Sequence, residues 1–148
     1  MKPQKSLNFY TLILLFCSLT FSQHSFAKNT DLDEKIKVVI HVSHSGKSNY
    51  QTALNYAYHI RGKYGDNALI AIISNGAGVG LINSNNSYKN QIRGLMTNNV
   101  KFAACNATLT SLKKNNKPIP VVKDVEIVPA GILRVLELQQ QGYLYIQP

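Results

Sequence analysis

The sequence is poor in acidic residues. Its 148 residues include only seven Asp and Glu against sixteen Lys and Arg, and the formal net charge is +9. Hydrolases commonly use a pair of carboxylates or a Ser-His-Asp set, and neither arrangement is recognisable. The basic residues are scattered, and the one cluster, formed by Lys113, Lys114 and Lys117, has no aromatic residues interleaved. The charge therefore indicates a solvated basic surface and no binding of nucleic acid.

Long apolar runs are also lacking. The run over residues 12–21 is too short to span a membrane. It follows a segment with two lysines and precedes Ser25-Phe26-Ala27, which has small residues at the two positions that a signal peptidase recognises. We therefore predict a signal peptide over residues 1–27 and a periplasmic or secreted mature chain with no membrane anchor. Residues 28–35 are then a flexible leader, and residues 36–148 form a single domain.

Cysteine is scarce as well, with two in the sequence. Cys17 lies within the predicted signal peptide, so the mature chain retains Cys105 alone. An intramolecular disulfide is therefore excluded, even in an oxidising compartment. A single thiol in an exported protein is buried as a small apolar side chain, paired between subunits, or used chemically.

Two apolar patterns alternate along the rest of the chain. Runs rich in β-branched residues predict five strands, at residues 36–42, 68–74, 100–104, 125–128 and 143–146. Helical spacing of apolar residues predicts helices at 49–62, 87–98 and 106–114, and from 132 to just before Gly142. Short buried strands that alternate with helices predict an α/β fold, in which a mostly parallel sheet is covered on both faces.

The loops that follow the strands are expected at one edge of this sheet. Right-handed crossovers bring these loops to the carboxyl edge, where open α/β sheets bind ligands. The edge gathers residues 43–47, 75–80, 105–106 and 129–131. The candidate binding residues there are Asn106, His44, Lys47, Asn75, Gly76 and Gly78.

Two glycine-containing segments at this edge match phosphate-binding motifs only in part. Gly46-Lys47-Ser48 has the end of a P-loop, but His41 occupies the position where that motif requires glycine. The turn over residues 76–80 follows a strand, but its glycines lack the spacing of the dinucleotide fingerprint. We therefore predict no nucleotide and no other cofactor, and interpret the turn as a place of close backbone approach that could hold a small anion.

His41 and His44 flank the end of the first strand, and Cys105 could lie near them. Two imidazoles and a thiolate could hold zinc or copper. His41, however, lies between Ile40 and Val42 and could face a covering helix, and the sequence offers no further ligand. We therefore predict no metal, and a site at these three residues is the alternative.

Cys105 lies where the third strand ends and a helix begins. Asn106 is a suitable N-cap for that helix, because its side-chain oxygen can accept a backbone N–H of the first turn. Free N–H groups and the positive end of the helix dipole favour an anion, and a thiolate is one. We therefore predict a lowered thiol pKa, with His44 or Lys47 as further stabilising groups, and a role for Cys105 as a nucleophile.

The order of these segments is also informative. The most specific stretches are residues 100–109 around the cysteine and the ending at 137–148. The other stretches that matter are the first strand, Ala53-Leu54-Asn55 in the first helix, the turn at 75–78 and residues 125–132. Together they resemble the DsrE/DsrF-like (intracellular sulfur oxidation protein) family over nearly all of the mature chain.

The resemblance implies a three-layer α/β/α fold of the DsrEFH-like kind and homo-oligomers, often trimers or hexamers. In sulfurtransferase members, a cysteine at the strand end that corresponds to Cys105 carries a persulfide between partner proteins. One departure is the loop at residues 43–46, which is usually acidic in relatives and is Ser-His-Ser-Gly here.

Two functional hypotheses follow. In the first, the protein is an exported sulfur-relay protein or sulfurtransferase, in which Cys105 carries a persulfide between donor and acceptor thiols. In the second, it is a non-catalytic oligomeric module that binds a small ligand or a partner, and Cys105 is structural. Many exported relatives have no established activity, and a shared fold does not fix chemistry.

Overall fold

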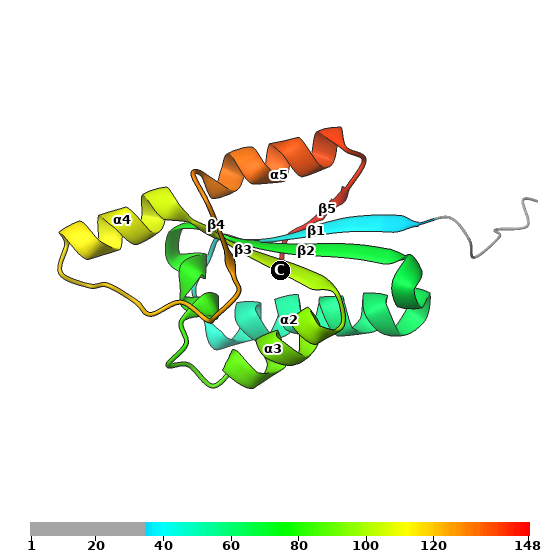
Figure 1. Cartoon of the computed structure of the whole chain (residues 1–148), viewed down its shortest axis with the longest axis horizontal. Coiled ribbons are helices and arrows are strands. Elements are labelled where there is room, and N and C mark those ends of the chain that lie inside the picture. The colour runs from blue at the N-terminus through cyan, green and yellow to red at the C-terminus, as the bar shows by residue number, and fades with distance from the viewer. Residues whose placement is uncertain (1–34) are drawn as a thin grey trace, which may run out of the picture. The chain divides into compact units, whose positions relative to one another are not determined.

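The computed structural model describes residues 35–148, in which five strands form one sheet flanked by helices (Figure 1). The strands are β1 (Ile36–Val42), β2 (Ala68–Ser74), β3 (Val100–Cys105), β4 (Glu126–Val128) and β5 (Leu144–Ile146). The helices are α2 (Lys47–Tyr64), α3 (Lys89–Thr97), α4 (Asn106–Lys114) and α5 (Gly131–Gln140), with 3-10 segments η1 (Gly65–Asn67) and η2 (Gly76–Ile82).

The predicted signal peptide, and all of the predicted leader except Lys35, lie outside the described residues. None of the helices from residue 35 onward is both long and apolar enough to cross a bilayer.

The strand order in the sheet is β4-β3-β2-β1-β5, and all four pairs of neighbouring strands are parallel. The predicted α/β fold with a five-stranded, mostly parallel sheet is therefore confirmed. β1 shows why the sequence folds this way, since every residue from Val38 to Val42 is buried. A strand buried on both faces is typical of a parallel sheet between helical layers.

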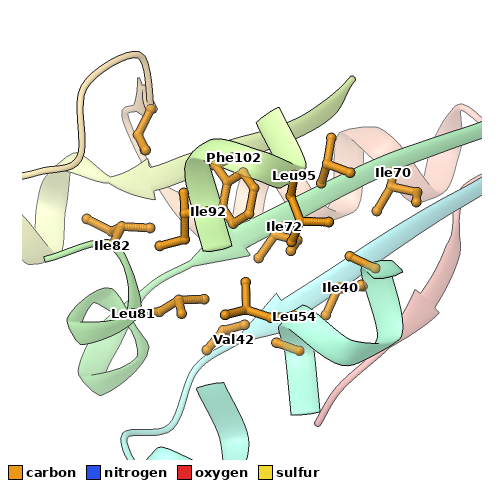
Figure 2. Close-up of a cluster of buried hydrophobic side chains, with 14 of the residues drawn as sticks. Ile40, Val42, Leu54, Ile70, Ile72, Leu81, Ile82, Ile92, Leu95 and Phe102 are labelled. Carbon is orange, nitrogen blue, oxygen red and sulfur yellow. The ribbon is translucent and has the colours of Figure 1, made fainter. Parts of the chain in front are cut away.

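Helices cover both faces of the sheet, with α5 on one side and α2 and α3 on the other (Figure 1). The larger core lies on the side of α2 and α3, and Figure 2 shows Leu54 of α2 and Leu95 of α3 among side chains of the strands. The smaller core lies beneath α5, where Val135 and Leu138 pack against the strands. The strand residues of this smaller core are Val39, Ala71, Ile73, Ala103 and Val128.

The alternation of side chains along the strands determines which residues face α5. Val39, Ile73 and Ala103 face α5, so the residues two positions later on the same strands face it as well. Those residues are His41, Asn75 and Cys105; Asn75 continues the extended backbone of β2, with φ −140° and ψ 173°. The fold thus places the cysteine on the α5 side of the carboxyl edge.

Two predicted boundaries are wrong at the first helix. α2 begins at Lys47, not at residue 49, and continues through Gly62 to Tyr64. Gly62 lies inside α2, in an open position where a side chain would meet no atom within 4 Å. The helix ends at Gly65, whose φ of 52° is in the left-handed region that favours glycine.

Candidate functional site

Cys105 is the last residue of β3 and the N-cap of α4. Its side chain is only 6% exposed, whereas the next residue, Asn106, is exposed. The prediction that Asn106 caps the helix is wrong, because Asn106 is the first residue of α4 and Cys105 is its N-cap. Cys105 itself has the extended backbone of an N-cap, with φ −72° and ψ 112°, so Asn106 already lies inside the helix.

Four polar groups act on the Cys105 sulfur. Burial is the largest influence and by itself raises the pKa of the thiol, because a buried thiolate is poorly solvated. The Thr108 hydroxyl and the backbone N–H groups of Gly131, Thr108 and Ala107 donate toward the sulfur and lower that pKa. Together these donors outweigh burial, so the pKa of the Cys105 thiol lies below its ordinary value. The direction matches the expectation from the sequence.

The donors come from the N-termini of two helices. Ala107 and Thr108 belong to the first turn of α4, and Gly131 is the first residue of α5. Neither first turn contains an acidic residue, so both helix dipoles favour negative charge at the sulfur. The Ala107 N–H also donates to the carbonyl oxygen of Pro129 over 3.2 Å, which links α4 to the segment that enters α5.

The Thr108 hydroxyl is held by the turn after β2. The Gly76 N–H donates to Thr108 Oγ1 over 3.0 Å. Because this bond uses a lone pair of the oxygen, the hydroxyl proton is free to point to the sulfur. Gly76 therefore contributes to the site through its backbone, and its φ of 49° explains why the turn has glycine here.

Gly131 is packed closely between the other site residues. A Cβ atom at this position would lie 3.2 Å from the Cβ of Cys105 and 2.9 Å from the Cβ of Asn75. The absence of a side chain therefore lets the N-terminus of α5 approach the cysteine. Asn75 and Cys105 flank the same glycine, so these two predicted site residues are brought together.

Gly78 fits the interpretation of residues 76–80 as a place of close backbone approach. A Cβ atom on Gly78 would lie 1.9 Å from the carbonyl oxygen of Val42, so the turn after β2 lies directly against the end of β1. Hydrogen bonds tie the two loops together, from Asn75 N–H to Val42 O over 3.1 Å and from Gly78 N–H to Ser43 O over 3.3 Å.

His44 and Lys47 are exposed, and neither is among the groups that shift the pKa of Cys105. The His44 ring lies 3.0 Å from the Ser43 hydroxyl, and Lys47 is the first residue of α2. A role for these two residues in binding remains a prediction.

His41 uses both ring nitrogens within the protein. Nδ1 lies 2.9 Å from the Tyr145 hydroxyl oxygen and Nε2 lies 3.0 Å from Asn75 Oδ1. Within residues 35–148, no three His, Cys, Asp or Glu side chains are grouped so that they could hold a metal ion. The alternative of a metal held by His41, His44 and Cys105 therefore has no support from the geometry.

Thr108 and Gly131 were missed as site residues by reasoning from sequence. Thr108 lies three positions after an N-cap, where a helix presents a free N–H, so its spacing from Cys105 was an available signal. Gly131 lies in the 129–131 segment, which the sequence predicts at the carboxyl edge. Its contact with the sulfur depends on how α5 packs against the sheet, and local sequence patterns do not predict such a contact.

The fold and the site define an all-parallel α/β domain with a hydrogen-bonded thiol at the carboxyl edge of its sheet. Comparison with known families agrees, since the DsrE/DsrF-like family matches residues 34–148. The protein belongs to this family, as its cysteine segment and its ending indicated.

Solved structures support the fold. A protein of unknown function from Methanobacterium thermoautotrophicum is similar, with a TM-score of 0.68 and 20% sequence identity over 76% of this chain and 99% of that one. Another from Bacteroides thetaiotaomicron has a TM-score of 0.55 and 18% identity over 76% of this chain and 94% of that one. No curated protein matches the chain. At these identities, the structural likeness concerns the fold alone.

Proposed function

We propose that the protein is a sulfur carrier of the sulfur-relay type, in which Cys105 holds a persulfide between a donor and an acceptor thiol. The observation that supports this most is the set of donors from two helix N-termini around one thiol, which lowers its pKa. The thiolate is the nucleophilic form of a thiol, and such donors favour it. Family membership supports the same chemistry.

Each transfer balances without an oxidant or a reductant. The Cys105 thiolate attacks the outer sulfur of a donor persulfide, R–S–SH. A sulfur–sulfur bond forms to Cys105, the donor S–S bond breaks, and the donor leaves as the thiolate R–S⁻. An acceptor thiolate then attacks the outer sulfur of the Cys105 persulfide and releases the Cys105 thiolate.

The surface around Cys105 is suited to a partner that brings a thiol to it. The sulfur is nearly covered, but Gly76, Ala77, Asn106 and Pro129 around it are exposed. These residues belong to η2, to the first turn of α4 and to the segment between β4 and α5, all at the carboxyl edge, so a donor or acceptor protein would dock there.

The proposal is tested by the intact mass of the protein after incubation with a small-molecule persulfide donor and removal of excess donor. We expect a gain of one sulfur, reversed by an acceptor thiol and absent in Cys105→Ser. An unchanged mass in the wild type would contradict it and favour the non-catalytic binding module with a structural Cys105. Expression of the full-length sequence in bacterial cells also tests the signal peptide. We expect the protein in the periplasm or the medium, with the intact mass of a chain that begins at Lys28.

We also propose that the chain forms a homo-oligomer, a trimer or a hexamer, through the outer face of α5. Ile132, Leu133 and Leu136 on this face are 48%, 55% and 50% exposed, and Ile127 on the edge strand β4 is 47% exposed. Apolar side chains exposed together on one helix are typical of an interface. We expect light scattering to give about three or six times the monomer mass for the wild type and the monomer mass for Leu133→Lys with Leu136→Lys. A monomeric wild type at micromolar concentration would contradict the proposal.

A further inference from the structure

Four polar side chains form a row across the α5 side of the sheet, near its carboxyl edge. They are Tyr145 on β5, His41 on β1, Asn75 after β2 and Cys105 on β3. These strands are consecutive neighbours in the sheet (Figure 1). The pairing register places Tyr145 beside Val39 and His41 beside Ile73, so the row begins within the sheet and ends at the cysteine.

His41 is the member of this row that the proposed sulfur chemistry does not use. It is 6% exposed and lies between the buried apolar residues Ile40 and Val42 of β1. A buried imidazole is stable only when its nitrogens are hydrogen-bonded, and here Tyr145 and Asn75 satisfy them at 2.9 and 3.0 Å. An amide oxygen only accepts hydrogen bonds, so Nε2 carries a proton and donates it to Asn75 Oδ1.

Asn75 connects this histidine to the environment of the sulfur in two ways. Its Cβ and that of Cys105 both lie against Gly131, whose N–H donates toward the sulfur. The next residue, Gly76, donates its N–H to Thr108 Oγ1, and the Thr108 hydroxyl in turn acts on the sulfur. The conformation of Asn75 therefore affects donors on both α4 and α5.

We propose that His41 is a positioning residue for Cys105: by holding the Asn75 side chain from inside the sheet, it fixes the 75–76 turn that keeps the Thr108 hydroxyl against the sulfur. The proposal deepens the proposed function and rests on it, since it concerns the same nucleophile. Its test measures only the ionisation of the thiol. The protein could therefore fail to carry sulfur while His41 still positions Cys105, or carry sulfur while His41 has no effect on the thiol.

The charged groups near His41 and Cys105 are compatible with a connection between these two residues through Asn75. The first turns of α4 and α5 contain no acidic residue, and within the described residues Tyr145 is the one titratable side chain hydrogen-bonded to the His41 ring. Arg134, on α5, is paired with Glu126 and Glu137. An effect of His41 on the thiol is therefore expected to pass through Asn75 rather than through a neighbouring ion.

The experiment measures the rate of alkylation of Cys105 by iodoacetamide as a function of pH, in the folded full-length mature chain. His41→Phe keeps a ring of similar size and removes both nitrogens. We expect it to raise the pKa of Cys105 by about half a unit, which lowers the rate at neutral pH about threefold. The rate at high pH, where every thiol is ionised, is expected to stay the same. Thr108→Val, which removes the donor itself, should raise the pKa by about one unit.

Two further variants distinguish positioning from a general loss of structure. His41→Gln keeps an amide N–H that can reach Asn75 and should restore a pKa close to that of the wild type. The double variant His41→Phe with Asn75→Ala should shift the pKa no further than Asn75→Ala alone, because both act on one connection.

His59→Phe, at an exposed position on α2, is the matched control and should leave the pKa unchanged. An unchanged pKa in His41→Phe, additive shifts in the double variant, or no rescue by His41→Gln would each overturn the proposal. A rate that rises at every pH would indicate loosened packing around the thiol and would overturn it as well.

Discussion

Alanine at Gly78 is expected to destabilise the fold by about 3 kcal/mol or more, the upper range for adding one carbon to a packed interior. The added Cβ would lie 1.9 Å from the carbonyl oxygen of Val42, a backbone atom that cannot rotate away. Either the turn after β2 or the end of β1 must move. That movement would also break the hydrogen bond from Gly78 N–H to Ser43 O.

Urea denaturation followed by circular dichroism measures this change. Gly62→Ala is the matched control, because Gly62 lies within α2 and an added Cβ there meets no atom within 4 Å. Alanine in an open helical position should stabilise the protein by about 0.5–1 kcal/mol. Equal midpoints for Gly78→Ala and the wild type would show that the two loops are not packed as described.

Alanine at Gly131 is expected to leave the fold in place and to abolish most of the thiol reactivity at neutral pH. The new Cβ would lie 3.2 Å from the Cβ of Cys105 and 2.9 Å from that of Asn75, so the first turn of α5 must move outward. That movement takes the Gly131 N–H away from the sulfur. A donor that lowers the pKa of the thiol is lost, so the pKa rises and the thiolate fraction at pH 7 falls.

The effect of Gly131→Ala on the alkylation rate should depend on pH. A rise of about one unit in the pKa lowers alkylation near pH 7 about tenfold. Above the pKa of both proteins the two rates should converge, because each thiol is then fully ionised. Iodoacetamide kinetics across pH measure this difference, and Gly62→Ala again serves as the control. A Gly131→Ala protein with the wild-type pH profile would contradict the assignment of the Gly131 N–H as a donor to the sulfur.

Sequence patterns were sufficient for most of the fold. The strands at 36–42 and 68–74 were predicted to the residue, because β-branched runs buried on both faces leave few alternatives. The three residues of β4 and of β5 were included in slightly longer predicted strands. The direction of each crossover then placed the loops, and Cys105, at the carboxyl edge.

The site was only partly predictable, because its chemistry depends on contacts between distant segments. That Cys105 ends a strand and precedes a helix is local information. That His41 bonds Asn75, 34 positions away, and Tyr145, 104 positions away, is set by the strand order. The same histidine could have faced either layer of helices, and periodicity alone does not assign the layer.

The strand order also has a consequence for the order in which the site forms. β5 pairs with β1, although β1 is made first and β5 last. Both the Tyr145 contact to His41 and the Gly131 contact to Cys105 depend on the segment from residue 131 onward. A chain in which only β1 to β4 have formed therefore has a cysteine without the N-terminus of α5 beside it. The thiol therefore acquires its full set of donors only when the segment from residue 131 onward packs against the sheet, which requires contacts between distant parts of the chain.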